Sequence, residues 1–103
     1  MEKIKINYSA CECEPWTDEL EVKKISIETG IIYCKTDDPR IKQTDGYVMI
    51  PMDEAFYKEN YDGTKHYRIG NEKCHEMSIW VEWSDVKEWM DTATFDYINW
   101  TAA

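Results

Sequence analysis

The sequence predicts an α+β fold: one compact domain, residues 1–103, with a mainly antiparallel sheet of five or six strands packed against a C-terminal amphipathic helix. Three observations lead to this fold class. Several short segments alternate apolar and polar residues, as half-buried strands do. The last quarter of the chain repeats its apolar residues at helical spacing instead. Isoleucine occurs 11 times and leucine once, which favours β-branched strands over leucine-packed helices.

Two strands are expected near the N-terminus. Residues 3–10 alternate cleanly, and one face of this strand carries the apolar side chains of Ile4, Ile6, Tyr8 and Ala10. Residues 20–27 read as a second strand, but their apolar phase slips near the middle. A β-bulge at Lys23 and Lys24 would produce this slip.

The middle of the chain reads as short elements separated by turns. Gly30 marks a hairpin turn into a third strand at 31–35. After a loop that contains two aspartates and a proline, residues 47–51 form a short strand that Pro51 ends. One short helix or helical turn is expected near 52–61, because acids stand early in this segment and a glycine follows it. Residues 66–70 form a brief strand.

The C-terminal third predicts a strand followed by the amphipathic helix. The strand is 75–83, the most regular alternation in the chain, and Ser84 then offers an N-cap. Five apolar residues follow at spacings of four and three, so they fall on one helical face with Trp89 at its edge. This face consists of Val86, Met90, Ala93, Tyr97 and Trp100.

Cys11 and Cys13 stand one residue apart in the segment CECEP, which reads as a turn closed by Pro15. Paired zinc ligands are usually separated by two to four residues, and redox pairs by two. The sequence therefore predicts no metal and no cofactor. A small zinc module that also uses Cys34 and Cys74 stays open as an alternative, although Cys34 fits a core position.

No catalytic motif is present, and the protein is expected not to be an enzyme. The chain has no nucleophile elbow, no glycine-rich phosphate loop and no HExxH segment. Its two histidines, His66 and His75, belong to no recognised motif. Numerous carboxylates usually form a solvated surface rather than a catalytic site.

The net charge of −9 restricts the partners of this protein. Residues 72–103 carry seven acids and two bases, so −5 of this charge lies in the last third. Such a charge disfavours binding to nucleic acids and to anionic membranes, and favours a basic protein surface. No segment resembles a signal peptide or a membrane span, so a cytoplasmic location is expected.

An acidic and aromatic surface in the last third is the predicted partner-binding site. On the helix, the side opposite the apolar face carries two acids and an aromatic residue, and more acids precede them. Phe95 has two interpretations: either a helix break near Thr92 buries it, or it is an anchor ringed by acids. The predicted site consists of Trp80, Glu82, Asp85, Glu88, Asp91 and Phe95.

These features favour an acidic inhibitor that occupies the basic nucleic-acid-binding site of a nuclease, partly as a nucleic-acid mimic. An anti-CRISPR or other anti-defence protein of a phage or mobile element would act in this way. An immunity protein against a toxin nuclease is the first alternative. A zinc module, a nucleotide-binding sponge, and an acidic domain whose charge serves only solubility are the others.

Overall fold

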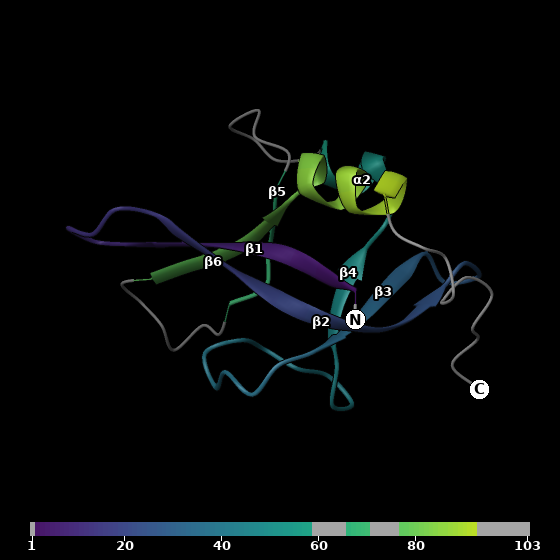
Figure 1. Cartoon of the computed structure of the whole chain (residues 1–103), viewed down its shortest axis with the longest axis horizontal. Coiled ribbons are helices and arrows are strands. Elements are labelled where there is room, and N and C mark those ends of the chain that lie inside the picture. Colours follow the sequence, from purple (N-terminus) through teal and green to yellow (C-terminus); the bar gives the residue numbers. More distant parts are fainter. Residues whose placement is uncertain (1, 59–65, 71–76, 93–103) are drawn as a thin grey trace.

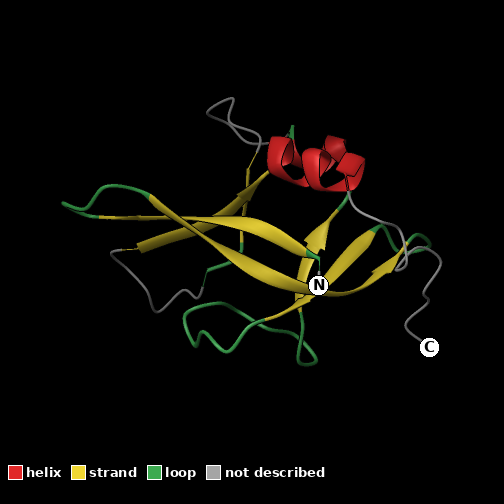
Figure 2. Cartoon of the chain, viewed as in Figure 1, coloured by secondary structure: helices red, strands yellow, loops and turns green. Residues whose placement is uncertain are grey.

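The computed structural model describes residues 2–58, 66–70 and 77–92. Over these residues it confirms the α+β fold: an antiparallel sheet of six strands curls until it is nearly barrel-shaped, with one short helix and one C-terminal helix (Figures 1 and 2). In chain order the elements are β1 (Lys3–Ala10), β2 (Trp16–Ser26), β3 (Ile31–Lys35), β4 (Val48–Pro51), α1 (Glu54–Tyr57), β5 (His66–Arg68), β6 (Met77–Glu82) and α2 (Trp83–Thr92).

The sheet has the strand order β4-β3-β2-β1-β6-β5. Strands β1 to β4 follow one another as antiparallel neighbours, whereas β6 returns to pair with the free side of β1. Tyr8 therefore lies opposite Trp16 on one side and Ile79 on the other. β5 pairs with β6 and forms one edge of the sheet, and β4 forms the other edge.

The predicted alternation of β1 and β6 decides which face of each strand is buried. Ile4, Ile6 and Tyr8 on β1 are at most 1% exposed, while Lys3 and Lys5 on the opposite face are exposed. On β6, the Ile79 and Val81 side chains are likewise buried in the same core. Because side chains alternate across a strand, the residues between them face outward, such as Lys5 on β1 and Trp80 on β6.

The predicted bulge is confirmed, because the register of β2 against β3 shifts between Val22 and Lys24. Lys24 is only 8% exposed although it is charged. Its ammonium group lies 4.9 Å from the ring centre of Tyr33 and 4.4 Å from that of Tyr47. Two aromatic faces thus stabilise a buried cation at the point where the strand bends.

The loop between β3 and β4 spans the gap between the two edges of the sheet. Ile41 forms a bridge with Gly70, and the Lys42 amide donates to the Ile69 carbonyl at 3.1 Å. Ile41 and Ile69 are both buried in the core. This loop therefore contributes to the curled shape of the sheet.

The short helix α1 follows β4 and contacts β5, since the ring centres of Phe56 and Tyr67 lie 5.2 Å apart. It was predicted near 52–61, and its four residues begin after Asp53, whose side chain accepts a hydrogen bond from Ala55 N–H. Tyr57 is completely buried, donates its hydroxyl to the Pro51 carbonyl at 2.7 Å, and lies 5.4 Å from the Trp83 ring. This ring contact holds α1 beside the start of α2.

Helix α2 packs over β1 and β6. It begins at Trp83, before the predicted cap at Ser84, because the chain passes from β6 directly into the helix. Val86 is buried as expected, but the larger anchor is Trp89, only 7% exposed, which the periodicity had placed at the edge of the face. Met90 is partly buried, and the expected contacts beyond Thr92 lie outside the described residues. Neither helix in the described part is long and apolar enough to cross a membrane.

Candidate functional site

The end of the β1–β2 hairpin is the most exposed part of the structure. Every residue from 11 to 19 is exposed, and this end of the hairpin stands away from both helices (Figure 1). It contains no lysine or arginine, and none of its carboxylates forms an ion pair with another described residue. We call residues 11–19 the acidic arm. Its four acids are Glu12, Glu14, Asp18 and Glu19.

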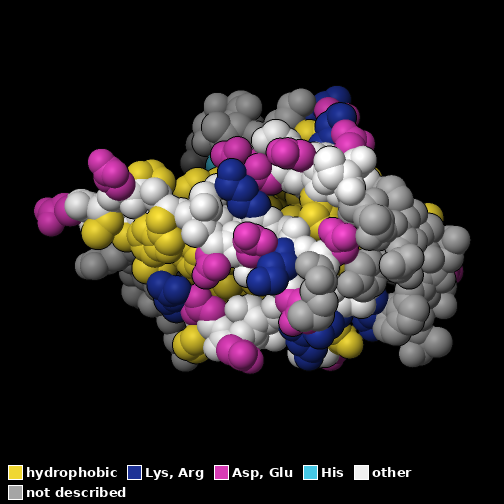
Figure 3. Space-filling model, viewed as in Figure 1, with side chains coloured by type: hydrophobic (Ala, Val, Ile, Leu, Met, Phe, Trp, Pro, Cys, Tyr) yellow, Lys and Arg dark blue, Asp and Glu magenta, His cyan; other side chains and the backbone are white. Residues whose placement is uncertain are grey.

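The surface of the acidic arm combines negative charge with apolar groups. Figure 3 shows acidic side chains at the tip of the hairpin and hydrophobic side chains directly behind them. Trp16 is 37% exposed, one of the few large apolar side chains that are exposed among the described residues. The exposed aromatic ring is typical of protein-binding surfaces, and the carboxylates disfavour a nucleic acid as the partner.

Aromatic stacking connects the acidic arm to the body of the protein. The rings of Trp16 and Tyr8 are parallel to within 1°, with centres 5.1 Å apart. The Arg40 guanidinium, from the loop between β3 and β4, lies 5.1 Å from the centre of the Tyr8 ring. The direction of the arm is therefore set by contacts with a distant loop as well as by its own backbone pairing.

Asp38 completes this support. Arg40 donates to both oxygens of Asp38, with Nη2 2.6 Å from Oδ2 and Nε 2.9 Å from Oδ1, and the Tyr8 hydroxyl donates to Oδ2 at 3.3 Å. Hydrogen bonding from Arg40 lowers the pKa of Asp38 to about 2. Burial, together with the Asp38 charge, raises the pKa of Tyr8 to about 12. Around neutral pH the carboxylate is therefore ionised and the phenol is neutral, as this hydrogen bond requires.

The residues predicted as a partner-binding site do not form one open acidic surface. The side chain of Asp85 is only 14% exposed. Its carboxylate accepts a hydrogen bond from the Asn7 amide at 3.3 Å and lies 3.9 Å from the Lys5 ammonium group. Asp85 therefore links α2 to β1, and a partner has little access to it.

The other predicted acids differ in their surroundings. Glu88 and Asp91 are exposed, as expected for the outer side of α2, but Asp91 is paired with Lys87 at 2.9 Å. Glu82 and Trp80 are half-buried on the outer face of β6, where the indole N–H donates to the Glu82 carboxylate at 3.4 Å. Phe95 lies outside the described residues, so neither interpretation of it is tested.

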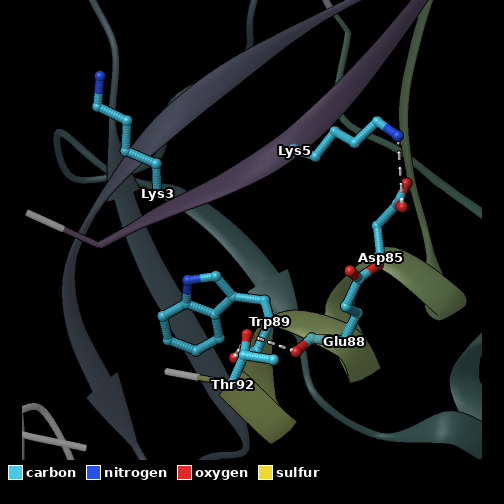
Figure 4. Close-up of a pocket in the computed structure, with 6 residues that line it drawn as sticks. All are labelled: Lys3, Lys5, Asp85, Glu88, Trp89 and Thr92. Atoms are coloured by element: carbon cyan, nitrogen blue, oxygen red, sulfur yellow. Dashed lines mark hydrogen bonds and ion pairs between the residues drawn. The ribbon is translucent and has the colours of Figure 1, made fainter. Parts of the chain in front are cut away.

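Lysines lie beside the acids of α2. A hollow of about 210 Å³ opens between α2 and β1, where Lys5 reaches toward Asp85 (Figure 4). A second hollow of about 370 Å³ includes Lys3 and Lys5 and extends to Asp18 and Glu19. The surface between α2 and β1 thus has mixed charge. The first hollow is lined by Lys3, Lys5, Asp85, Glu88, Trp89 and Thr92.

The four-cysteine zinc module does not agree with the structure. Cys34 is completely buried opposite Val22, whereas Cys11 and Cys13 are exposed beyond Trp16. Val22 and Trp16 stand six positions apart on β2, a strand length of about 20 Å. One zinc ion cannot reach both places, because its sulfur ligands lie about 2.3 Å away. The described residues contain no cluster of three or more acidic, cysteine or histidine side chains that could hold a metal ion.

Comparison with protein families, with curated proteins and with solved structures finds no match to this chain. The function proposed below therefore rests on the geometry and chemistry of the described residues.

The acidic arm was not among the predicted site residues. The net charge of the first 35 residues does not reveal the acidic arm, because the lysines of β1 and β2 offset the four acids of the arm. A sharper signal was present: nine consecutive residues with four acids, no base and one tryptophan. Their exposure could not be read from this run, because it depends on how far the hairpin extends past the neighbouring strands.

Proposed function

We propose that the protein is a non-catalytic inhibitor that inserts its acidic arm into the basic nucleic-acid-binding site of a nuclease or defence effector. The observation that supports this proposal most directly is that residues 11–19 are all exposed and bear four carboxylates but no basic residue. Carboxylates attract the lysines and arginines that otherwise contact phosphates, and thus exclude the nucleic acid. A projecting hairpin can enter a cleft, which a flat acidic surface cannot.

The support of the arm favours this function energetically. Binding is weakened by the entropy lost when mobile groups become ordered at an interface. Here Trp16 is already stacked on Tyr8, and Tyr8 is held by Asp38 and Arg40. A preformed arm therefore loses less entropy on binding than a free loop of the same sequence.

The outer side of α2 is proposed as a weaker, second contact. Glu88 and Asp91 are exposed there and keep the role predicted from the sequence. Their contribution is smaller because Lys87 forms an ion pair with Asp91 and offsets its charge. Long-range attraction depends on the summed charge of a surface, so mixed signs reduce it.

Charge reversal on each surface tests the proposal. Purified CRISPR effector nucleases and toxin nucleases form the panel, which separates an anti-CRISPR protein from an immunity protein. For each, nucleic-acid cleavage is assayed in the presence of this protein, and association rates are measured at several salt concentrations. Replacing Glu12 and Glu14 by lysine is expected to slow association by roughly tenfold and to flatten its salt dependence.

The matched control replaces Glu88 and Asp91 by lysine, which changes the net charge equally and again alters only exposed residues. This pair is expected to slow association by less. Inhibition of no nuclease in the panel contradicts the proposed function. Inhibition that both pairs weaken equally, or that only the α2 pair weakens, contradicts the role of the acidic arm.

A further inference from the structure

The tip of the acidic arm carries two exposed thiols. Cys11 and Cys13 flank Glu12, and both are free and exposed. The Cys13 N–H donates to the Ala10 carbonyl at 3.3 Å, which closes a four-residue turn around Cys11 and Glu12. The two thiols therefore occupy the second and fourth positions of one tight turn.

The backbone between the thiols is in an uncommon conformation. Glu12 has a φ of 65°, in the left-handed region that residues other than glycine rarely adopt. Such a residue reverses the chain direction locally, so Cys11 and Cys13 approach more closely than in a strand. Two Cα–Cα steps of about 3.8 Å that meet in a turn span roughly 5–6 Å. Disulfides form at Cα separations of about 4.4–6.8 Å.

We propose that Cys11 and Cys13 form a dithiol site that exchanges with low-molecular-weight disulfides and closes a reversible disulfide across the tip of the acidic arm. Exposure gives both sulfurs access to the reagent, and the estimated Cα separation across the turn falls within the range of disulfides. Cys34 differs in both respects, because it is completely buried. Burial also raises the pKa of the Cys34 thiol, which keeps it protonated and unreactive.

The oxidant in this exchange is a disulfide reagent such as oxidised glutathione. One hairpin thiol loses its proton and attacks a sulfur of the reagent, whose S–S bond breaks and releases one thiol. The second hairpin thiol then loses its proton and attacks the hairpin sulfur of this mixed disulfide, which releases the second thiol. The two cysteines are oxidised by two electrons, and the reagent is reduced to two thiols. This dithiol chemistry does not depend on the proposed nuclease partner, and it is a second property of the acidic arm beyond the proposed function.

The test uses the full chain with Cys74→Ser, because Cys74 lies outside the described residues and must not supply a third reactive thiol. The protein is equilibrated with mixtures of reduced and oxidised glutathione, alkylated, and analysed by intact mass and peptide mapping. We expect the loss of two hydrogens in the peptide that contains residues 11 and 13. Cys11→Ser or Cys13→Ser should instead accumulate a mixed disulfide with glutathione.

Glu12→Pro tests whether the turn itself promotes ring closure. Proline fixes φ near −65°, which excludes the left-handed backbone of residue 12. We expect the equilibrium constant for ring closure to fall by about tenfold. Circular dichroism should show an unchanged fold, since residue 12 is outside the core. Mixed disulfides without ring closure in the Cys74→Ser protein, disulfide-linked dimers, or an equal constant in Glu12→Pro would each overturn the proposal.

Discussion

The acidic arm and helix α2 both carry acids on their surfaces, but the acids of the arm form no ion pair with a described residue, whereas two acids of α2 do. Along the arm, four carboxylates are exposed and none forms an ion pair with a described residue. On α2, Asp85 is engaged with Asn7 and Lys5, and Asp91 is paired with Lys87. The number of acids in a segment is therefore a poor measure of the field that a partner meets.

The two regions also differ in what their aromatic residues do. Trp89 of α2 is buried in the core, whereas Trp16 of the arm stacks on Tyr8 where the core-facing side of the sheet opens to solvent, and is 37% exposed. One region stabilises the fold, and the other is stabilised by it. This difference allows the arm to be altered with little effect on the fold, which suits a surface that binds.

The largest expected effect separates these two tryptophans. Trp89→Ala should lower the free energy of unfolding by about 3–5 kcal/mol, because a large side chain leaves the core. Trp16→Ala should lower it by about 1 kcal/mol, since mainly one aromatic stack is lost. Urea unfolding followed by circular dichroism measures both. Similar losses of unfolding free energy for the two variants would show that Trp16 contributes to the core as much as Trp89 does. The proposed difference between the arm and α2 would then be wrong.

Trp89→Phe is the control for size. The Trp89 indole N–H is buried and has no hydrogen-bond partner among the described residues. Phenylalanine removes this unpaired donor and keeps most of the apolar contact, so its effect should be well below that of alanine. A loss equal to that of Trp89→Ala would point to a partner for the N–H.

A smaller effect is expected at Asp38, which supports the arm from the distant loop. Asp38→Asn should lower stability at pH 7 by about 1 kcal/mol, less than the pKa of about 2 alone implies, because Arg40 is 40% exposed and solvent screens the pair. The folded-state pKa lies below the ordinary value of 3.8, so this stabilisation is fully present above about pH 5 and is lost as pH falls toward 2.

The measurement is the difference in unfolding free energy between Asp38→Asn and the unaltered protein from pH 7 to pH 2. This difference should shrink through the lower part of that range. A difference that stays constant with pH would show that the Asp38 charge has no part in holding the arm.

The exposed pair on α2 should contribute still less. Hydrogen bonding and the charge of Asp91 raise the pKa of Lys87, but both side chains are more than 60% exposed. A double-mutant cycle with Lys87→Ala and Asp91→Ala should give a coupling energy smaller than the Asp38 effect, and added salt should reduce it further. A coupling energy that persists at high salt would contradict this prediction, because it would show that solvent and ions do not screen the Lys87–Asp91 pair.

The smallest expected effect concerns metal removal. A chelator should leave the thermal midpoint unchanged, because Cys34 and the thiols of the arm lie too far apart to share one ion. Differential scanning calorimetry, together with elemental analysis for zinc, checks this. One zinc per protein, with unfolding on chelation, would contradict it.

Much of the fold follows from local patterns in the sequence. The alternation of residues 3–10 identifies β1 and its buried face, and the slipped phase of the next strand identifies the bulge near Lys24. Cys34 fits its core position. These predictions succeed because side-chain direction along a strand depends on backbone geometry within a few residues.

Other features depend on contacts between distant parts of the chain, and only the tertiary structure decides them. β2 begins at Trp16 although residues 16–19 are all exposed, because β1 pairs with them and no apolar pattern is needed. Asp85 lies 78 positions from Asn7 in sequence, yet the return of β6 alongside β1 brings them into hydrogen-bonding distance. The sequence by itself determined where acids occur and which strand faces are apolar. Which acids remain open to a partner was decided by the closing of the sheet, because burial and pairing depend on neighbours that local periodicity does not specify.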